Sequence, residues 1–190
     1  MKEEIFINLE REIFRGNVLD IGARNYGIIY NVYKKYNDDI SLEYINGEKD
    51  KENIKDDYYD NCILLFSFRN VYFKRTKTKL VKEIYKYMKT GGCLYIWDID
   101  KNYGKTFNGK LKILVPNGKL KKLSIKDINI FKDNSKKTIL SILKPYFKIE
   151  DLKNSDGIYY IKAKKLKNDK KLQDEETRKE EKNESSVSSG

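Results

Sequence analysis

The chain has 190 residues, 39% of them apolar, and this length suits one domain of ordinary size with a short appendage. It contains no histidine, which excludes imidazole bases, histidine-bound zinc and nucleophile–histidine pairs. The net charge is +11, but lysine is abundant throughout the chain, so the charge alone does not indicate a nucleic-acid partner.

The apolar segments and the cysteines favour a cytoplasmic protein. No run of about 18 or more apolar residues occurs, so no membrane span is expected, and the N-terminus lacks the apolar core of a secretory signal. Cys62 and Cys93 lie in apolar runs and are expected in the core. Two cysteines are too few for a disulfide framework or a zinc site, so no metal is predicted.

Helices and strands alternate along the first third of the chain. Residues 3–14 have apolar residues at every fourth position and predict a helix, which Gly16 ends. Residues 17–21 and 40–45 predict two strands, and residues 29–36 have helical spacing between them. Strand, glycine-bearing turn and helix in this order indicate the start of a βαβ unit.

The middle of the chain continues this alternation after a polar segment, residues 46–60, in which neither a helix nor a strand is predicted. Residues 61–66 are almost continuously apolar, which is typical of a strand buried on both faces. Residues 76–89 predict a helix that closes on Lys89-Thr90-Gly91-Gly92, a basic last turn followed by a glycine stop. Residues 93–98 predict the next strand.

The second half of the chain contains hairpin signals. Asn117-Gly118 stands between two β-like runs in residues 111–125, which is the strongest short-range signal of a hairpin. Residues 135–144 predict a helix before Pro145, and residues 147–152 and 158–164 predict an antiparallel strand pair.

These elements predict an α/β fold with a mostly parallel sheet, an antiparallel C-terminal edge pair and a β-hairpin insertion. The folded domain is expected to span residues 1–165. Residues 166–190 are almost entirely charged or polar and cannot bury enough surface to offset their ordering entropy, so they predict a disordered tail.

The predicted hairpin is basic and would stand above the mouth of a ligand site. It is either a solvated ribbon in a lysine-rich protein or a lid that recruits an anionic substrate. Its lysines are Lys110, Lys112, Lys119, Lys121, Lys122 and Lys126.

Candidate ligand-binding residues lie where the first two predicted strands end. In open α/β sheets, ligands bind beyond the carboxyl ends of the strands. Asp20 ends the first strand, Gly22 allows close backbone approach, and the helix starting near Gly27 points its free N–H groups to the same place. Glu43 ends the second strand, where a carboxylate can accept hydrogen bonds from both hydroxyls of a ribose.

Three segments resemble a known family. Val18-Leu19-Asp20-Ile21-Gly22 is similar to motif I of class I S-adenosylmethionine-dependent methyltransferases, which have a Rossmann-like sheet. Lys89–Ile96 resembles the glycine-containing entry to their fifth strand, and residues 146–164 resemble their C-terminal strand pair. The resemblance covers residues 16–164.

The resemblance implies that S-adenosylmethionine is the cofactor. Gly22 and the turn that contains Ala23, Arg24 and Gly27 would approach its amino-acid part, and Glu43 would hold its ribose. Phe66, Ser67 and Phe68 would lie near the adenine and the sulfonium, where aromatic faces suit a cation.

The sequence also departs from the family. Arg24 and Tyr26 stand where glycines are usual, and the short segment between Glu43 and Asn61 leaves little room for a third strand. No Asn-Pro-Pro-Tyr follows residues 61–66, which favours a small-molecule acceptor over nucleic-acid bases. Neither the acceptor, a catalytic base nor the oligomeric state is specified.

Two other functions compete with methyl transfer. One is a non-catalytic protein that kept the fold and lost or altered cofactor binding. The other is a nicotinamide-dependent oxidoreductase, which needs Gly-x-Gly-x-x-Gly where this chain has Gly22-Ala23-Arg24-Asn25-Tyr26-Gly27.

Overall fold

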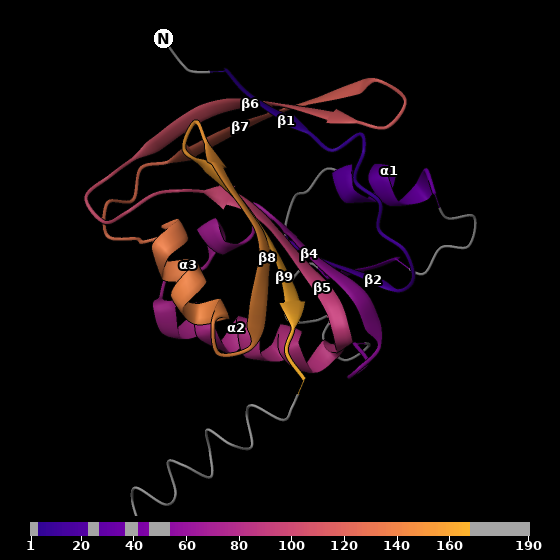
Figure 1. The fold of residues 1–190 in the computed structure, drawn as a ribbon. Helices are drawn as coiled ribbons and strands as arrows, with labels where there is room; N and C mark the ends of the chain where they lie inside the picture. The colour runs from indigo at the N-terminus through magenta and orange to yellow at the C-terminus, as the bar shows by residue number, and fades with distance from the viewer. Residues whose placement is uncertain (1–3, 23–26, 37–41, 46–53, 168–190) are drawn as a thin grey trace, which may run out of the picture.

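The protein combines two β-sheets with helices packed against the larger one (Figure 1). The structure, a computed structural model, describes residues 4–22, 27–36, 42–45 and 54–167. For residues 42–45 it describes the backbone alone. The predicted tail, residues 166–190, lies outside the described residues except for its first two. Leu166 is bonded to the domain, because its N–H donates to the Tyr146 carbonyl and its own carbonyl accepts from the Tyr85 hydroxyl.

The larger sheet, called the central sheet, has the strand order β3-β2-β4-β5-β9-β8. Strands β3, β2, β4 and β5 run parallel. Strand β9 is antiparallel to both of its neighbours, β5 and β8, so the predicted antiparallel edge pair is confirmed. The six strands are β2 (Val18–Ile21), β3 (Leu42–Ile45), β4 (Tyr59–Leu65), β5 (Met88–Ile99), β8 (Phe147–Ser155) and β9 (Ile158–Lys165).

The smaller sheet, called the outer sheet, contains the predicted hairpin. Strands β6 (Phe107–Val115) and β7 (Lys119–Asp127) pair in antiparallel register on either side of Asn117-Gly118. Three residues, 116–118, connect the strands, and Asn117 and Gly118 both have φ near +65°, the left-handed conformation that asparagine and glycine adopt in tight hairpin loops.

The prediction of a helix over residues 3–14 is wrong. Residues Glu4–Asn8 form strand β1, which pairs in parallel with β6 and completes the outer sheet. Ile5 and Ile7 are buried while Phe6 between them is 58% exposed, which is the period-two pattern of a strand. The spacing of Ile5 and Leu9 fits both a strand, with a period of two residues, and a helix. The strand forms because β6 offers an unpaired edge with which these residues can pair.

Three α-helices are present in the described residues: α1 (Ile28–Lys34), α2 (Lys74–Tyr87) and α3 (Lys136–Leu143). Ser135 caps α3, because its hydroxyl accepts a hydrogen bond from Thr138 N–H. Helix α2 ends at Tyr87, two residues before the predicted end, because Met88 is already extended. The segment Lys89–Gly92 therefore belongs to β5 and not to a helical C-terminus.

Each face of the central sheet has its own core. Helices α2 and α3 cover one face, and the outer sheet and α1 cover the other (Figure 1). Leu111, Ile113, Val115 and Ile125 of the hairpin are buried in the second core. The hairpin thus covers the central sheet with its apolar face, while most of its lysines lie on the exposed positions of β6 and β7.

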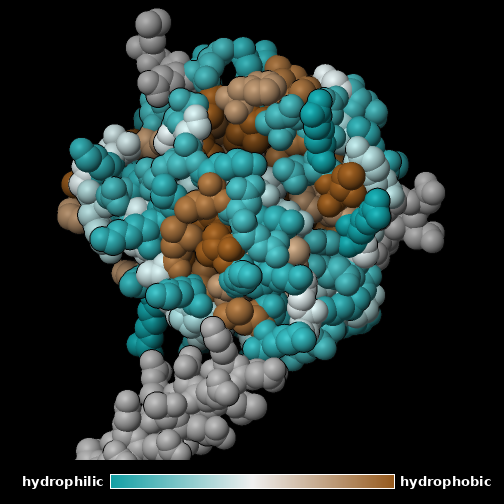
Figure 2. All heavy atoms as spheres, in the orientation of Figure 1, coloured by the Kyte–Doolittle hydropathy of each residue, from teal (hydrophilic) through white to brown (hydrophobic). Residues whose placement is uncertain are grey.

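Some large apolar side chains remain exposed in the loops after β4, β5 and β7. The face shown in Figure 2 is mostly hydrophilic, with separate hydrophobic patches instead of one continuous apolar surface. The exposed residues of these loops are Tyr72, Phe73, Tyr103, Ile128, Ile130 and Phe131.

Candidate functional site

The strand order reverses direction between β2 and β4. From β2 the chain passes through α1 to the neighbouring strand β3, whereas β4 lies on the other side of β2 and is followed by α2. The buried residues of α1 and α2 belong to the cores on opposite faces of the sheet. The loops that leave β2 and β4 therefore diverge, and the crevice between them is the usual ligand site of open α/β sheets.

Gly22 and Ser67 bring these two loops into contact. The Ser67 hydroxyl donates a 2.5 Å hydrogen bond to the Ile21 carbonyl, and both Gly22 and Ser67 are buried. A Cβ added to Gly22 would lie 2.5 Å from Ser67 Oγ, too close for two non-bonded atoms. The glycine was expected to allow close approach of a ligand. In the structure, the group that approaches its Cα is the Ser67 side chain.

Asp20 and Phe66 flank this contact. Asp20 is 2% exposed at the end of β2, and Phe66 is 5% exposed directly after β4. Phe66 has φ +56°, a conformation uncommon for a bulky side chain, and its N–H donates a 2.7 Å hydrogen bond to the Trp97 carbonyl. This strained residue turns the chain out of β4, and strained backbone of this kind is frequent at functional sites.

The expected aromatic cradle for a sulfonium is not formed by Phe66 and Phe68. The two rings belong to the two opposite cores, and Phe68 is fully buried on the helix-covered face. Their contribution is to fix the loop that presents Ser67 and the backbone around it.

The other predicted residues lie at the same edge or outside the described part. Gly27 has φ +66° and precedes α1, as predicted, and its carbonyl accepts from the Asn31 side chain. Helix α1 has only seven residues. Ala23 and Arg24 lie outside the described residues. The Glu43 backbone pairs with Leu19, two residues before β3 ends at Ile45, so Glu43 does not end the strand; its side chain is not described.

The end of β5 contains a buried polar chain that the sequence did not reveal. Asp98 accepts hydrogen bonds from the backbone N–H groups of Arg69 and Ile99 and from the Asn134 side chain. Asn134 in turn accepts a 3.0 Å hydrogen bond from Lys77 Nζ. Burial raises the pKa of Asp98 to about 6 and lowers the pKa of Lys77 to about 8, because each charged form loses water.

A second buried ionic group closes the same end of the sheet. Asp127 lies between Lys132 Nζ, at 2.6 Å, and Lys101 Nζ, at 3.6 Å, and all three residues are buried. The two ammonium groups also donate to backbone carbonyls of Arg69 and Asn129. These contacts attach the loop after β7 to the loops after β4 and β5, and they indicate a structural role for the charges.

Three other polar residues of these loops do not form a catalytic group. Tyr72 and Tyr103 are more than half exposed. Asp100 accepts hydrogen bonds from Lys136 N–H and from the Asn154 side chain, which are structural contacts between loops.

Solved structures resemble this arrangement of strands and helices. The PH0226 protein from Pyrococcus horikoshii superposes with a TM-score of 0.53 and 15% identity, over 80% of this chain and 82% of that one. An S-adenosylmethionine-dependent methyltransferase from Mesorhizobium loti superposes with a TM-score of 0.53 and 11% identity, over 81% of this chain and 93% of that one.

The described part of the chain has the fold of S-adenosylmethionine-dependent methyltransferases. No protein-family model and no curated protein sequence matches the chain. At identities of 11–15% the likeness concerns the fold alone. In this methyltransferase fold, Gly22 and Ser67 lie at the reversal of strand order, where the sequence resemblance also placed the cofactor.

Neither a membrane helix nor a metal cluster is found within the described ranges. No described helix is long and apolar enough to cross a membrane. The described cysteines and acids form no group of three that could hold a metal ion.

Proposed function

We propose that this protein is a cytoplasmic S-adenosylmethionine-dependent methyltransferase that acts on a small molecule. The observation that carries the proposal is the contact of Gly22 with Ser67 at the reversal of strand order, in a chain with the methyltransferase fold. The two cysteines are free thiols, which is consistent with a reducing compartment.

The residues at this edge fit the cofactor in part. Bound S-adenosylmethionine would supply an electrophilic methyl group on a sulfonium, so the protein has mainly to position the acceptor. Asp20 brings a buried carboxylate close to the crevice, and the loop after Gly22 would hold the amino-acid part of the cofactor. Glu43 would bind the ribose hydroxyls, with Phe66 and Ser67 on the opposite wall.

Loss of cofactor binding is the second candidate, and two observations favour it. Arg24 and Tyr26 replace glycines that the family uses next to the cofactor. The Ser67 side chain also occupies the space beside Gly22. In this case the fold would persist as a scaffold without methyl transfer.

One calorimetric titration of the full chain separates these functions. We expect S-adenosylmethionine and S-adenosylhomocysteine to bind and NAD not to bind. Absence of binding by both sulfur compounds would contradict the proposal and support loss of the cofactor. Binding of NAD alone would instead indicate an oxidoreductase.

Variants of Arg24 distinguish a functional cofactor site from one that has lost cofactor binding. If Arg24 pairs with the cofactor carboxylate, Arg24→Ala weakens binding, and the loss is smaller at high salt because the ion pair is screened there. If Arg24 blocks an empty site, Arg24→Gly creates binding that the wild type lacks. We expect the first result.

A further inference from the structure

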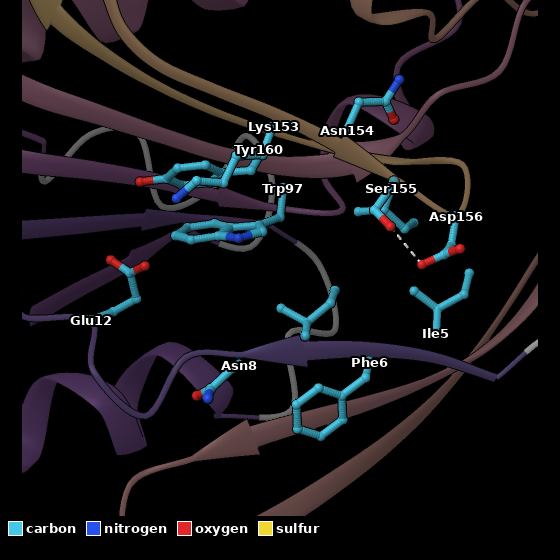
Figure 3. A pocket seen from close by; sticks show the side chains of 12 residues that line it. Ile5, Phe6, Asn8, Glu12, Trp97, Lys153, Asn154, Ser155, Asp156 and Tyr160 are labelled. Carbon is cyan, nitrogen blue, oxygen red and sulfur yellow. Dashed lines mark hydrogen bonds between the residues drawn. The ribbon is translucent and has the colours of Figure 1, made fainter.

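A pocket of about 210 Å³ lies between the outer sheet and the exposed end of the β8–β9 hairpin (Figure 3). Strand β1 lines one side of the pocket, with Ile5 toward its interior and Phe6 on the opposite face of the strand, and Trp97 and Tyr160 of the central sheet lie across from β1. The volume equals that of about seven water molecules in the liquid, below the range of about 300–1,000 Å³ typical of drug-sized ligands. The pocket therefore suits a fragment-sized compound.

Aromatic rings form one wall of this pocket. The Trp97 and Tyr160 rings are 4.8 Å apart between centroids and inclined by 37°, and the Tyr95 ring is nearly parallel to the Trp97 ring at 6.2 Å. Trp97 is 5% exposed, so its neighbours hold the indole in one orientation. A fixed indole face attracts flat apolar groups and cations.

The charges that line the pocket are acidic once internal ion pairs are considered. Lys153 lines the pocket with its ammonium 5.3 Å from the centroid of the Tyr160 ring, and the same ammonium pairs with Asp151 at 2.9 Å. Asp156, at the far end, accepts only a hydrogen bond from the neighbouring Ser155 hydroxyl among the residues described. In a chain of net charge +11, a pocket with acidic unpaired groups is a local exception.

Glu12 is the acid closest to the aromatic wall. Figure 3 shows its carboxylate at one end of the Trp97 and Tyr160 rings. Glu12 is half-buried, and its carboxylate has no hydrogen bond or ion pair within the part of the chain that the structure describes. Burial raises its pKa, while Lys153 and Lys162 lower it; these two lysines have their own partners, Asp151 and Glu150.

We propose that this pocket binds a small organic cation with a flat apolar body, whose ammonium group pairs with Glu12 and whose body lies against Trp97 and Tyr160. An anion would meet the unpaired carboxylates of Glu12 and Asp156 without a free cation to balance it. A neutral compound would gain the aromatic contacts but leave Glu12 without a partner. The inference does not depend on cofactor binding or on methyl transfer.

Trp97 is the only tryptophan in the chain, so its fluorescence reports directly on the pocket. The full chain, without cofactor, is titrated at pH 7.5 with three probes of similar size: phenethylamine, 2-phenylethanol and 3-phenylpropanoate. We expect phenethylamine to change the emission saturably, with an affinity at least about tenfold above that of 2-phenylethanol. We expect 3-phenylpropanoate to leave the emission unchanged.

Glu12→Gln and Glu10→Gln are matched variants, because Glu10 is an acid two residues away that does not line the pocket. Glu12→Gln should lower the affinity for phenethylamine to that of 2-phenylethanol, while Glu10→Gln leaves it unchanged, and thermal melts should show both variants folded. Equal affinities for all three probes, no response to any of them, or an unchanged phenethylamine affinity in Glu12→Gln would overturn the proposal. Because no cofactor is present, such a failure would leave the methyltransferase proposal unaffected.

Discussion

Two regions next to β5 differ in whether their acidic side chains have partners: the buried ionic groups at the end of the strand, and the pocket lined by Trp97. Asp98 near the end of β5 and Asp127 at the end of β7 are almost fully buried, and each carboxylate contacts several donors. In the pocket, Glu12 is only half-buried and has no partner among the described residues.

This difference distinguishes acidic side chains that stabilise the fold from an acidic side chain that is available to a ligand. A buried charge is tolerated when its partners are supplied by the fold, and removing one partner leaves the other uncompensated. A carboxylate left without a partner beside an aromatic wall can instead gain one from a ligand. Substitutions in the two regions should therefore have different signs as well as different sizes.

Asp127→Asn should produce the largest loss of stability, because it leaves the buried ammonium groups of Lys101 and Lys132 without a counter-charge. We expect the free energy of unfolding, measured by urea denaturation, to fall by about 3 kcal/mol. Glu4→Gln removes an exposed ion pair with Lys112 and is the control, with little or no expected loss because solvent screens the pair. Equal losses in the two variants would show that the buried ion pairs of Asp127 contribute no more to stability than an exposed ion pair.

Asp98 should make the stability depend on pH. Its pKa is raised to about 6 in the folded protein and is about 3.9 when unfolded, so the folded state binds the extra proton between these values. The stability from this group is present below about pH 4 and is lost as the pH rises through about 6, by up to about 3 kcal/mol. The measurement is the difference in unfolding free energy between wild type and Asp98→Asn at pH 4 and pH 7. A difference that does not change with pH would exclude a raised pKa.

Substitution of Gly22 tests whether close packing between the loops after β2 and β4 stabilises this edge of the sheet. Gly22→Ala should displace the Ser67 hydroxyl from Ile21 and lower the free energy of unfolding by about 1–3 kcal/mol. We also expect about tenfold weaker binding of S-adenosylmethionine, because the two loops are pushed apart.

The double variant Gly22→Ala/Ser67→Gly removes the clash and should restore both stability and affinity. Its calorimetric titration is compared with those of the two single variants. If stability returns but binding does not, the cofactor itself needs the space beside Gly22, as the sequence suggested.

Glu12→Gln should have the smallest effect on stability, and the sign should be positive. Burial raises the pKa of Glu12 in the folded protein, so ionisation opposes folding and its removal helps slightly at neutral pH. We expect a gain of less than about 1 kcal/mol, since the side chain is partly exposed and screened by solvent. A loss of stability in urea denaturation would mean that Glu12 has a structural partner after all.

Several parts of the fold could be predicted from the sequence because local signals agreed with the tertiary contacts. The apolar run 61–66 lies in the centre of the sheet, and Asn117-Gly118 forms the expected hairpin turn. Gly22 and Ser67 were both predicted at the edge of the site. Their direct contact could not be predicted, because it depends on β2 and β4 being neighbours.

The sequence by itself determined the order of helices and strands from β2 to β9 and the edge of the sheet at which a ligand site was expected, because those signals are local in the chain. Only the tertiary structure decided that residues 4–8 form a strand, because the same apolar residues fit two periods until β6 offers an edge. It also decided which acids have partners. The donors to Asp98 come from three separate segments. The Glu12 carboxylate has no hydrogen bond or ion pair among the described residues, because the two lysines near it, Lys153 and Lys162, pair with Asp151 and Glu150.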